Sequence, residues 1–551
     1  MAESPQPTQS HAAPPTADLE TLLERIPLVD PTEAASLLAG FLGRTDLEEI
    51  SDEALSGLID RLETPLERTA KALRLSLRQS PLPMSAQARE QLSALFTLYR
   101  ASQSLANLRL GLVEVGDARQ AIAIAHRHRV EWAARLIVDC YQLYVGVPQP
   151  LYADLHQFAR AARRDLEAKQ PEAWSEVRDI YVAVLLLAMV NPYALTVGEM
   201  GVLYPCLRKV ARMVEITSDR PSGSARFIDI TGRLAPHIAV SGGKANPDGA
   251  VYLGVDALYR PETVDGLDPE CRVALRGFLH RLQFLLISRE ARRRDHLEQA
   301  IGERSLVTIG FHSVHHRLLD DMLYSLPASQ HLTFSGLDWE GLERPVHGQV
   351  KAGPSIHDFK LEIDSGARDD VDWEAMPDAN GRPATPRLNE PATWDVVNLS
   401  ERGLRLHWRL ADNSRAAVDE LILIERDPDE EVGGLAAVIG VGIIRWVRHL
   451  DEANRTIDMG VERLPGDWMA YFAHPADESP HTAGTWPVLA RLVEGDQIDQ
   501  LILPPDLADR GSRITVIREQ GEDRHLILER IVMVGSHLVV METSPNKGGN
   551  A

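Results

Sequence analysis

The sequence predicts an α+β protein, with an all-helical region in its N-terminal part and a β-rich region in its C-terminal part. From residue 18 to about 220, apolar residues recur at three- and four-residue steps, as in Leu22, Leu23 and Ile26, which is the period of amphipathic helices. From 393 to 545, β-branched and alternating segments dominate, which is typical of strands. A chain of 551 residues is too long for one hydrophobic core, so we expect roughly two to four domains.

The helical region carries clear start and stop signals. Asp30, followed by Pro31 and Glu33, predicts a helix that begins with an N-cap, a proline in the first turn and an acidic residue. The segment Ile180–Val190 is apolar on every side, which predicts a buried central helix, and Asn191-Pro192 ends it. No period of 34 to 47 residues repeats cleanly, so the sequence favours a non-repeating helical domain over a solenoid.

The composition limits the classes of partner. Hydrophobic residues make up 44% of the chain, and the net charge is −22. Because coating a nucleic acid requires an excess of lysine and arginine, we expect no nucleic-acid partner, although a local arginine pocket for a small anion is compatible with this charge. The cysteines, Cys140, Cys206 and Cys271, are widely spaced and predict neither a disulfide framework nor a zinc site, which suits a reducing compartment. Cys206 lies in an apolar stretch and is interpreted as a small buried hydrophobe.

The N-terminal segment and the hydropathy pattern predict a cytoplasmic protein. Residues 1–17 are rich in Pro, Ser and Thr, lack the basic and apolar regions of a signal peptide, and are expected to be disordered. The longest apolar run, Ile180–Val190, is shorter than the roughly 20 residues that a membrane helix needs, so no membrane association is expected.

The stretch Trp394–Trp408 contains the most informative pattern. Leu404, Leu406 and Trp408 are apolar and alternate with polar or small residues, which predicts a half-buried strand, and the residues from Trp394 onward favour a second strand. Between them lies the hexad Asn398-Leu-Ser-Glu-Arg-Gly403, a polar turn in which Asn and Ser can bond the backbone and Gly permits positive φ or a close approach.

This hexad, with the segments after it, resembles the PilZ domain, a bacterial β-barrel family that binds the second messenger cyclic di-GMP. The family signature is Arg-x-x-x-Arg followed by Asp/Asn-x-Ser-x-x-Gly, and Asn398, Ser400 and Gly403 fit its second half. The downstream segments Gly434–Val447 and Arg455–Leu464, with their Arg-Trp and Gly-Val pairs, are similar to later PilZ strands. The resemblance covers roughly residues 390 to 475. It implies an antiparallel β-barrel in which Asn398 and Ser400 bond a guanine edge and Gly403 lets the ligand approach.

The resemblance also implies a pair of arginines that holds phosphates and purine faces. Arg289 and Arg293 fit Arg-x-x-x-Arg and precede a predicted strand at 305–311, but more than 100 residues separate them from the hexad. The unpatterned segment 345–392 is interpreted as an insertion that explains this spacing. A nearer pair, Arg382 and Arg387, has one residue too many between its arginines. A helix C-terminus whose cations face water is the alternative explanation of Arg289 to Arg294.

Other polar clusters are less specific. His312, His315 and His316 lie near two aspartates, but adjacent histidines on one element seldom converge on one metal, so a surface or core cluster is favoured. The segment His126–Arg129 is interpreted as a solvated helix face. No catalytic triad, zinc-protease or paired-carboxylate motif is visible, and we expect no enzyme activity, no cofactor and no metal.

Together these patterns predict a non-enzymatic effector that binds cyclic di-GMP in a PilZ-like barrel and engages an unidentified protein partner through its helical domain. The alternative is a scaffold or chaperone-like interaction protein whose barrel has lost ligand binding. The expected regions are a disordered tail (1–17), a helical domain (18–220), a mixed α/β connector ending in a basic helix (221–300), a first barrel strand with a short helix (301–344), a flexible insertion (345–392), the PilZ-like barrel (393–475) and an additional β subdomain (476–545).

Overall fold

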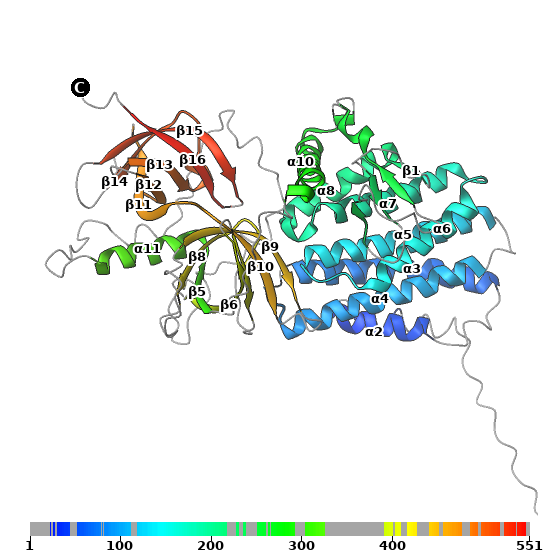
Figure 1. Cartoon of the computed structure of the whole chain (residues 1–551). Coiled ribbons are helices and arrows are strands. Elements are labelled where there is room, and N and C mark those ends of the chain that lie inside the picture. The colour runs from blue at the N-terminus through cyan, green and yellow to red at the C-terminus, as the bar shows by residue number, and fades with distance from the viewer. Residues whose placement is uncertain are drawn as a thin grey trace, which may run out of the picture. The chain divides into compact units, whose positions relative to one another are not determined.

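The computed structural model consists of two compact units (Figure 1). The first is built from Met1–Ser80, Met84–Pro192 and Glu199–Glu290, and the second chiefly from Ala291–Ala551. The structure describes residues 23, 26–27, 30–43, 52–78, 80, 82–111, 118–217, 227–230, 235–238, 251–260, 263–264, 266–291, 304–325, 391–400, 403–408, 416–426, 440–450, 456–476, 485–493, 497–517, 523–535 and 537–546.

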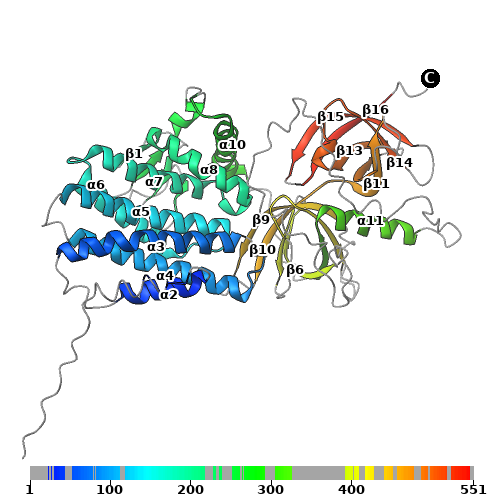
Figure 2. The ribbon, with the colours of Figure 1, turned by 180° about the vertical axis from the view of Figure 1, so that it is seen from behind.

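The first unit is predominantly helical, and Figure 2 shows its helices from the opposite side. Its longer helices are α2 (Pro31–Leu42), α3 (Asp52–Arg78), α4 (Ala86–Gly111), α5 (Ala118–Gln142), α6 (Gln149–Leu166), α7 (Pro171–Met189), α8 (Val197–Val210) and α10 (Pro269–Ala291). Helix α4 packs against α2, α3 and α5, and α5 also contacts α6 and α7. The α+β class predicted from the sequence is confirmed, because this helical part precedes antiparallel barrels.

Two local helix predictions are confirmed. The Asp30 side chain caps α2 by accepting hydrogen bonds from the backbone N–H groups of Thr32 and Glu33, at 2.9 and 3.1 Å. In α7, every residue from Ile180 to Leu187 is at most 7% exposed, as expected for a segment that is apolar on all sides. The chain turns at Asn191, which adopts a positive φ of 54°. Asparagine tolerates this conformation better than most residues, which explains why α7 ends there.

The segment His126–Arg129 is not the solvated helix face that the sequence suggested. His126 is 1% exposed, and its Nε2 lies 3.0 Å from Asp165 Oδ2. Burial lowers the pKa of His126, although Asp165 opposes this effect. His128 contacts the Ser102 hydroxyl and Glu63, at 2.7 and 3.3 Å. Arg127 is exposed, but His126, His128 and Arg129 are buried or partly buried, so most of this polar segment packs against neighbouring helices.

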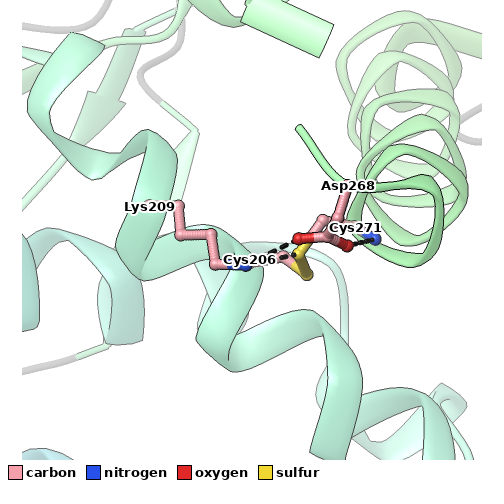
Figure 3. Close-up of a disulfide and its surroundings, with 4 residues drawn as sticks. All are labelled: Cys206, Lys209, Asp268 and Cys271. Atoms are coloured by element: carbon pink, nitrogen blue, oxygen red, sulfur yellow. Dashed lines mark hydrogen bonds and ion pairs between the residues drawn. A yellow bond between two sulfur atoms is a disulfide. The ribbon is translucent and has the colours of Figure 1, made fainter. Parts of the chain in front are cut away.

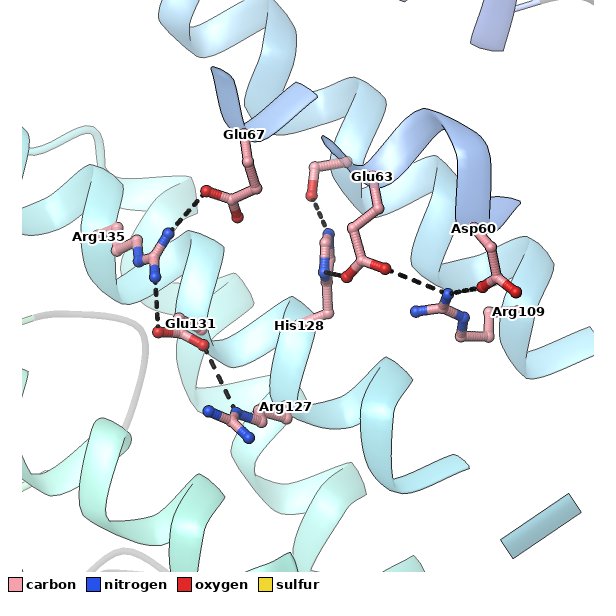
Figure 4. A network of polar contacts seen from close by, with 9 residues as sticks. Asp60, Glu63, Glu67, Arg109, Arg127, His128, Glu131 and Arg135 are labelled. Carbon is pink, nitrogen blue, oxygen red and sulfur yellow. Dashed lines mark hydrogen bonds and ion pairs between the residues drawn. The ribbon is translucent and has the colours of Figure 1, made fainter. Parts of the chain in front are cut away.

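A network of charged side chains links α3, α4 and α5 around His128 (Figure 4). Arg109 donates to Asp60 and Glu63 across the α3–α4 boundary, at 2.7 and 3.4 Å. The hydrogen bond from His128, with the charge of Arg109, lowers the pKa of Glu63 below its ordinary value. Arg135 joins Glu67 of α3 to Glu131 of its own helix, with both contacts at 2.9 Å. These pairs connect the three helices at a partly exposed surface.

A small sheet and a disulfide complete the first unit. Strands β1 (Glu215–Thr217), β4 (Tyr252–Gly254), β2 (Phe227–Asp229) and β3 (His237–Ile238) form a sheet in that order. Cys206 of α8 and Cys271 of α10 are joined by a disulfide, beside which Lys209 pairs with Asp268 at 2.7 Å (Figure 3). The expectation that the cysteines form no disulfide was therefore wrong. A separation of 65 residues leaves no spacing motif in the sequence.

The second unit contains two closed antiparallel barrels of six strands each. The first barrel consists of β5 (Arg304–Ile309), β6 (Ala392–Leu399), β7 (Gly403–Trp408), β8 (Leu421–Arg426), β9 (Gly440–His449) and β10 (Ile457–Arg463), closed in the order β10-β7-β6-β5-β8-β9. Strand β5 pairs with both β6 and β8, so the strand that precedes the long segment 326–390 is an integral part of this barrel. The residues of that segment lie outside those that the structure describes.

The alternation along β7 decides which side chains fill the first barrel. Leu404, Leu406 and Trp408 are buried, and the residues between them are only partly buried, as the sequence predicted. Trp408 stacks on Trp394 of β6, with ring centroids 5.1 Å apart. Because successive strand residues point to opposite faces, Arg405 and His407 lie on the outside of the barrel.

The second barrel consists of β11 (Asp467–Pro475), β12 (Trp486–Val493), β13 (Gln497–Leu503), β14 (Arg513–Ile517), β15 (Arg524–Val534) and β16 (Val539–Pro545), closed in the order β11-β12-β13-β16-β15-β14. Strand β11 belongs to this barrel, so the first barrel ends at Arg463 rather than at the expected boundary of 475. The sequence pattern does not mark this change, because only the short turn around Gly466 separates β10 from β11.

Helix α11 (Phe311–Ser325) packs against strands of both barrels (Figure 1). Its Val314 shares one apolar cluster with Leu423 of the first barrel and Leu489 of the second. His315 is buried in this cluster and contacts the Tyr471 carbonyl at 2.8 Å; burial lowers its pKa to about 4. His315 also contacts the Phe472 ring, with centroids 5.1 Å apart, so it packs between α11 and β11. Among the described residues no group of His, Cys, Asp and Glu is arranged to hold a metal ion. In the part of the chain that is described, no helix has the length and apolarity to cross a bilayer.

Candidate binding face of the first barrel

The predicted hexad forms the turn between β6 and β7. The Ser400 hydroxyl accepts a hydrogen bond from the Gly403 N–H and also contacts the Gly403 carbonyl, both at 3.1 Å. The Ser400 N–H donates to the same carbonyl at 2.8 Å. Ser400 therefore stabilises the turn through hydrogen bonds from its hydroxyl to the backbone, as serine often does in turns.

Gly403 is required by the packing of the barrel itself. A Cβ at this position would lie 2.6 Å from the Val461 carbonyl oxygen of β10, closer than real side chains approach a backbone oxygen. Its φ is not in the positive region, so the close approach between strands explains the glycine. The sequence pointed to a close approach by another molecule; in the structure the neighbour is β10.

Asn398 lies at the end of β6, opposite Arg405 of β7 and beside a β-bulge. Arg405 in turn lies opposite Gly460 of β10, and Gly460 lies opposite Trp446 of β9. These four residues form one row across four neighbouring strands. The row begins at the hexad and crosses the outside of the barrel, so the turn adjoins a continuous polar and aromatic face.

A charged cluster lies next to this row. Asp458 of β10 is completely buried, and Arg405 donates to its two oxygens at 2.8 and 3.0 Å. Arg448 of β9 donates to Oδ2 at 2.8 Å, and His407 lies 3.1 Å from Oδ1. Burial alone raises the pKa of Asp458, but its bonds to the two arginines hold that pKa below its ordinary value. The carboxylate therefore fixes the positions of both guanidinium groups.

The indole of Trp446 lies across Gly460. A Cβ added at Gly460 would overlap Nε1 and two ring carbons of this indole, so only glycine leaves space for it. The guanidinium carbon of Arg448 is 5.6 Å from the ring centroid. Trp446 is only partly buried, so this strand position holds an aromatic ring against the outer surface of the barrel.

The structure brings together only part of the predicted site. Asn398, Ser400 and Gly403 meet in one hairpin. Arg289 lies in the last turn of α10, and Arg293 lies outside the described residues, as do Arg382 and Arg387. The arginine half of the site thus stays a prediction. Asn398, Ser400 and Gly403 remain predicted ligand contacts, with Ser400 and Gly403 also serving the fold.

Sequence reasoning did not identify Arg405, Asp458 and Arg448 as one cluster. These residues come from three strands, and Asp458 is 53 positions from Arg405. The alternation along each strand indicates that these side chains point outward. The sequence does not indicate which strands pair with one another. Trp446 and Gly460 were noted only as features of strands, because their contact depends on the register between β9 and β10.

Comparison with known proteins gives one match. Residues 17–222 match the family described as "Cyclic-di-GMP receptor FimW, N-terminal domain". This range covers α2 to α8 of the helical unit and does not include the barrels. No curated protein and no solved structure matches the chain.

Proposed function

We propose that this chain is a receptor for cyclic di-GMP, with the ligand bound at the β6–β7 hairpin of the first barrel. The observation that carries the proposal is the match of residues 17–222 to a family described as a cyclic di-GMP receptor. The hexad Asn398–Gly403 supports the same ligand from a segment that this match does not include. The two indications are independent because they come from different parts of the chain.

The geometry supports an anionic purine ligand at this hairpin. Arg405 and Arg448 place positive charge on the face that begins at Asn398, and Asp458 holds them in position. Arginine suits such a ligand because its planar group bonds phosphates and stacks on rings. In this proposal the predicted pair Arg289 and Arg293 supplies the arginines that hold the ligand phosphates.

In this proposal the protein acts as a cytoplasmic, non-enzymatic effector. The barrel senses the ligand, and the helical unit engages a protein partner. Ligand binding at the barrel changes the state that the partner recognises.

Isothermal titration of the full chain with cyclic di-GMP tests the proposal. We expect saturable binding, with GMP and GTP as controls that bind far more weakly because they lack the second purine and the cyclic phosphate ring. Absence of both binding heat and thermal protection at high micromolar ligand would exclude the receptor function.

A scaffold that has lost ligand binding is the second candidate. It is favoured by two observations: Ser400 forms its hydrogen bonds within the turn, and Gly403 is explained by its contact with β10. Both residues are thus accounted for without a ligand. The same titration separates the two functions, because a scaffold gives no heat with cyclic di-GMP while retaining its fold.

A further inference from the structure

We propose that the Cys206–Cys271 disulfide is a reversible redox switch, in which Lys209 stabilises the thiolate that Cys271 forms when a dithiol reductant opens the bond. The inference goes beyond the proposed function, because it concerns the helical unit and requires no nucleotide ligand. It follows from the surroundings of Cys271, from the contacts between α8 and α10, and from the segment that the disulfide encloses.

The surroundings of Cys271 favour its thiolate form. This residue lies in the first turn of α10, where the helix dipole stabilises negative charge. Lys209 of α8 adds a positive charge, with its Nζ 3.6 Å from the sulfur (Figure 3). Asp268 caps the helix by accepting from the Cys271 N–H at 2.8 Å, and its pairing with Lys209 at 2.7 Å opposes the effect of the lysine in part. Cys206 lies in the C-terminal half of α8, away from a helix N-terminus, so Cys271 is the better leaving group of the two.

The third cysteine of the chain, Cys140, has the opposite environment. It is 0% exposed within α5, and burial raises the pKa of its thiol. The neighbouring charge of Asp139 raises this pKa further. A thiol in such surroundings stays protonated and reacts slowly. Cys140 therefore serves as an internal reference for the other two cysteines.

The disulfide lies close to the surface although both cysteines are buried. Cys206 and Cys271 are 1% and 4% exposed. The side chains of Lys209 and Asp268 beside them are 53% and 44% exposed, so the bond is covered by a solvated ion pair and by the first turn of α10. Exposed ion pairs contribute little to stability, and helix ends fray, so a local opening at this end of α10 admits a small reductant.

Opening the switch takes two thiol–disulfide exchange steps. One thiolate of the reductant attacks the Cys206 sulfur, the S–S bond breaks, and its electron pair leaves on the Cys271 sulfur. The second thiolate of the reductant then attacks its own sulfur in the mixed disulfide and releases Cys206. The reductant is thereby oxidised to a disulfide, and its two protons end on the two cysteines. A small disulfide such as oxidised glutathione closes the switch by the reverse steps.

The switch controls one end of α10 and the segment before it. The two cysteines are 65 positions apart, and strands β1 to β4 lie between them in the chain. Arg281 of α10 also pairs with Glu199 of α8, at 2.8 Å. The apolar face of α10 stays buried through Leu275, Phe278 and Leu282. Opening therefore loosens the first turn of α10 and the small sheet, while the rest of the helix keeps its contacts.

Trapping of the thiol state in the full chain tests the switch. The folded protein is incubated with dithiothreitol or with oxidised glutathione, quenched in acid, and labelled with a maleimide under denaturing conditions. Peptide mass spectrometry should show label on Cys140 alone after oxidised glutathione, and on all three cysteines after dithiothreitol. If Cys206 and Cys271 stay unlabelled after dithiothreitol, the bond is a permanent structural one. If they are labelled even after oxidised glutathione, no disulfide forms. Either result overturns the inference.

The rate of reduction tests the role of Lys209. Lys209→Gln should slow the reduction by dithiothreitol about three- to tenfold, because Cys271 then leaves as a less stabilised thiolate. Arg281→Gln is the matched control, since it removes the other ion pair between α8 and α10 and should be reduced as fast as the wild type. Equal rates for Lys209→Gln and the wild type would overturn the assignment of Lys209.

Hydrogen exchange and thermal melting measure what the switch changes. Reduction should lower the melting temperature of the helical unit by about 5–15 °C and raise the exchange of β1 to β4 and of the first turn of α10, but not that of α5. Cys271→Ser should resemble the reduced wild type and should not respond to dithiothreitol. If oxidised and reduced wild type exchange and melt alike, the bond controls no structure and the protein has no switch here.

Discussion

The two barrels have the same connectivity but different surfaces. When the strands of each barrel are numbered from first to sixth along the chain, the neighbours in both barrels are 1-2, 2-3, 3-6, 6-5, 5-4 and 4-1. The second barrel is therefore a topological repeat of the first. The sequence pattern did not predict this repeated connectivity. A barrel needs only alternating apolar positions and compatible turns, and many different sequences provide them.

The difference lies in the hairpin between the second and third strands. In the first barrel this hairpin contains Asn398, Ser400 and Gly403. In the second barrel the corresponding connection is Glu494-Gly-Asp496, between β12 and β13, and it contains neither the serine nor the spacing of the hexad. The same connectivity thus carries different residues at this hairpin, so the fold alone does not predict ligand binding.

A second difference concerns the salt bridges between the fifth and sixth strands. Arg448 pairs with Asp458 in the first barrel, and Arg530 pairs with Glu542 in the second. Asp458 is fully buried and also binds Arg405, whereas the Arg530 and Glu542 side chains are 69% and 38% exposed. The same strand pair thus carries a buried carboxylate that binds two arginines in one barrel and a solvated ion pair in the other.

The largest expected effect is on ligand affinity. Arg289→Ala combined with Arg293→Ala should lower the affinity for cyclic di-GMP by about two to four orders of magnitude, because each charge-assisted contact contributes roughly 1.5–3 kcal/mol. Calorimetric titration measures this loss. Arg382→Ala with Arg387→Ala is the matched control and should bind as the wild type does. A loss confined to the control pair would assign the arginine role to the residues nearer the hexad.

The next effect is on stability. Asp458→Ala leaves two guanidinium groups without their shared carboxylate and should lower the free energy of unfolding by about 2–3 kcal/mol; we discount the usual cost of a broken buried pair because both arginines are partly exposed. Chemical denaturation measures it. Glu542→Ala, at the corresponding strand pair of the second barrel, should change stability little. Equal losses in both variants would show that the two salt bridges are equivalent.

The same carboxylate predicts a dependence on pH. The pKa of Asp458 is lowered in the folded state, so its contribution to stability is complete above the unfolded pKa of about 3.9 and is lost as the pH falls through the folded pKa. The melting temperature of the wild type should therefore fall more steeply below pH 4 than that of Asp458→Asn. Parallel pH profiles would mean that Asp458 does not contribute to acid unfolding.

How much of this could be read from the sequence depends on how local each feature is. The cap at Asp30, the buried helix around Ile180 and the alternation along β7 were predicted because each is determined by residues a few positions apart. The Cys206–Cys271 disulfide, the burial of His126 and the repeat of the barrel connectivity were not, because they depend on which distant elements pack together.

The candidate site follows the same rule. Asn398, Ser400 and Gly403 were found because they lie within six consecutive residues. Arg405 lies close to the hexad in sequence, but its guanidinium is positioned by Asp458 of another strand. The Trp446 indole likewise lies against Gly460 of another strand. Those pairs are set by the register between strands, which a single sequence does not reveal.

A smaller effect on stability is expected at Gly403. Gly403→Ala places a Cβ 2.6 Å from the Val461 carbonyl and should lower the free energy of unfolding by about 1–2 kcal/mol, because β7 or β10 must shift. Gly440→Ala in the same barrel should be tolerated. Thermal and chemical denaturation of the two variants compare them directly. If Gly403→Ala is as stable as the wild type but binds cyclic di-GMP poorly, the glycine provides space for the ligand rather than for the packing of β7 against β10.

The smallest effect concerns Ser400, which has a role in the turn and a predicted role in binding. Ser400→Ala removes the hydroxyl that accepts from the Gly403 N–H and contacts its carbonyl, while the bond from the Ser400 N–H to that carbonyl remains. We expect a loss of about 1 kcal/mol in binding and less in folding, since the turn is partly exposed and water can replace the hydroxyl. Titration and thermal melting of the same preparation measure both. Asp496→Ala, in the corresponding hairpin of the second barrel, should leave binding unchanged. If Ser400→Ala loses stability but binds cyclic di-GMP with full affinity, the serine only closes the turn, and the hairpins of the two barrels differ in their structure rather than in what they bind.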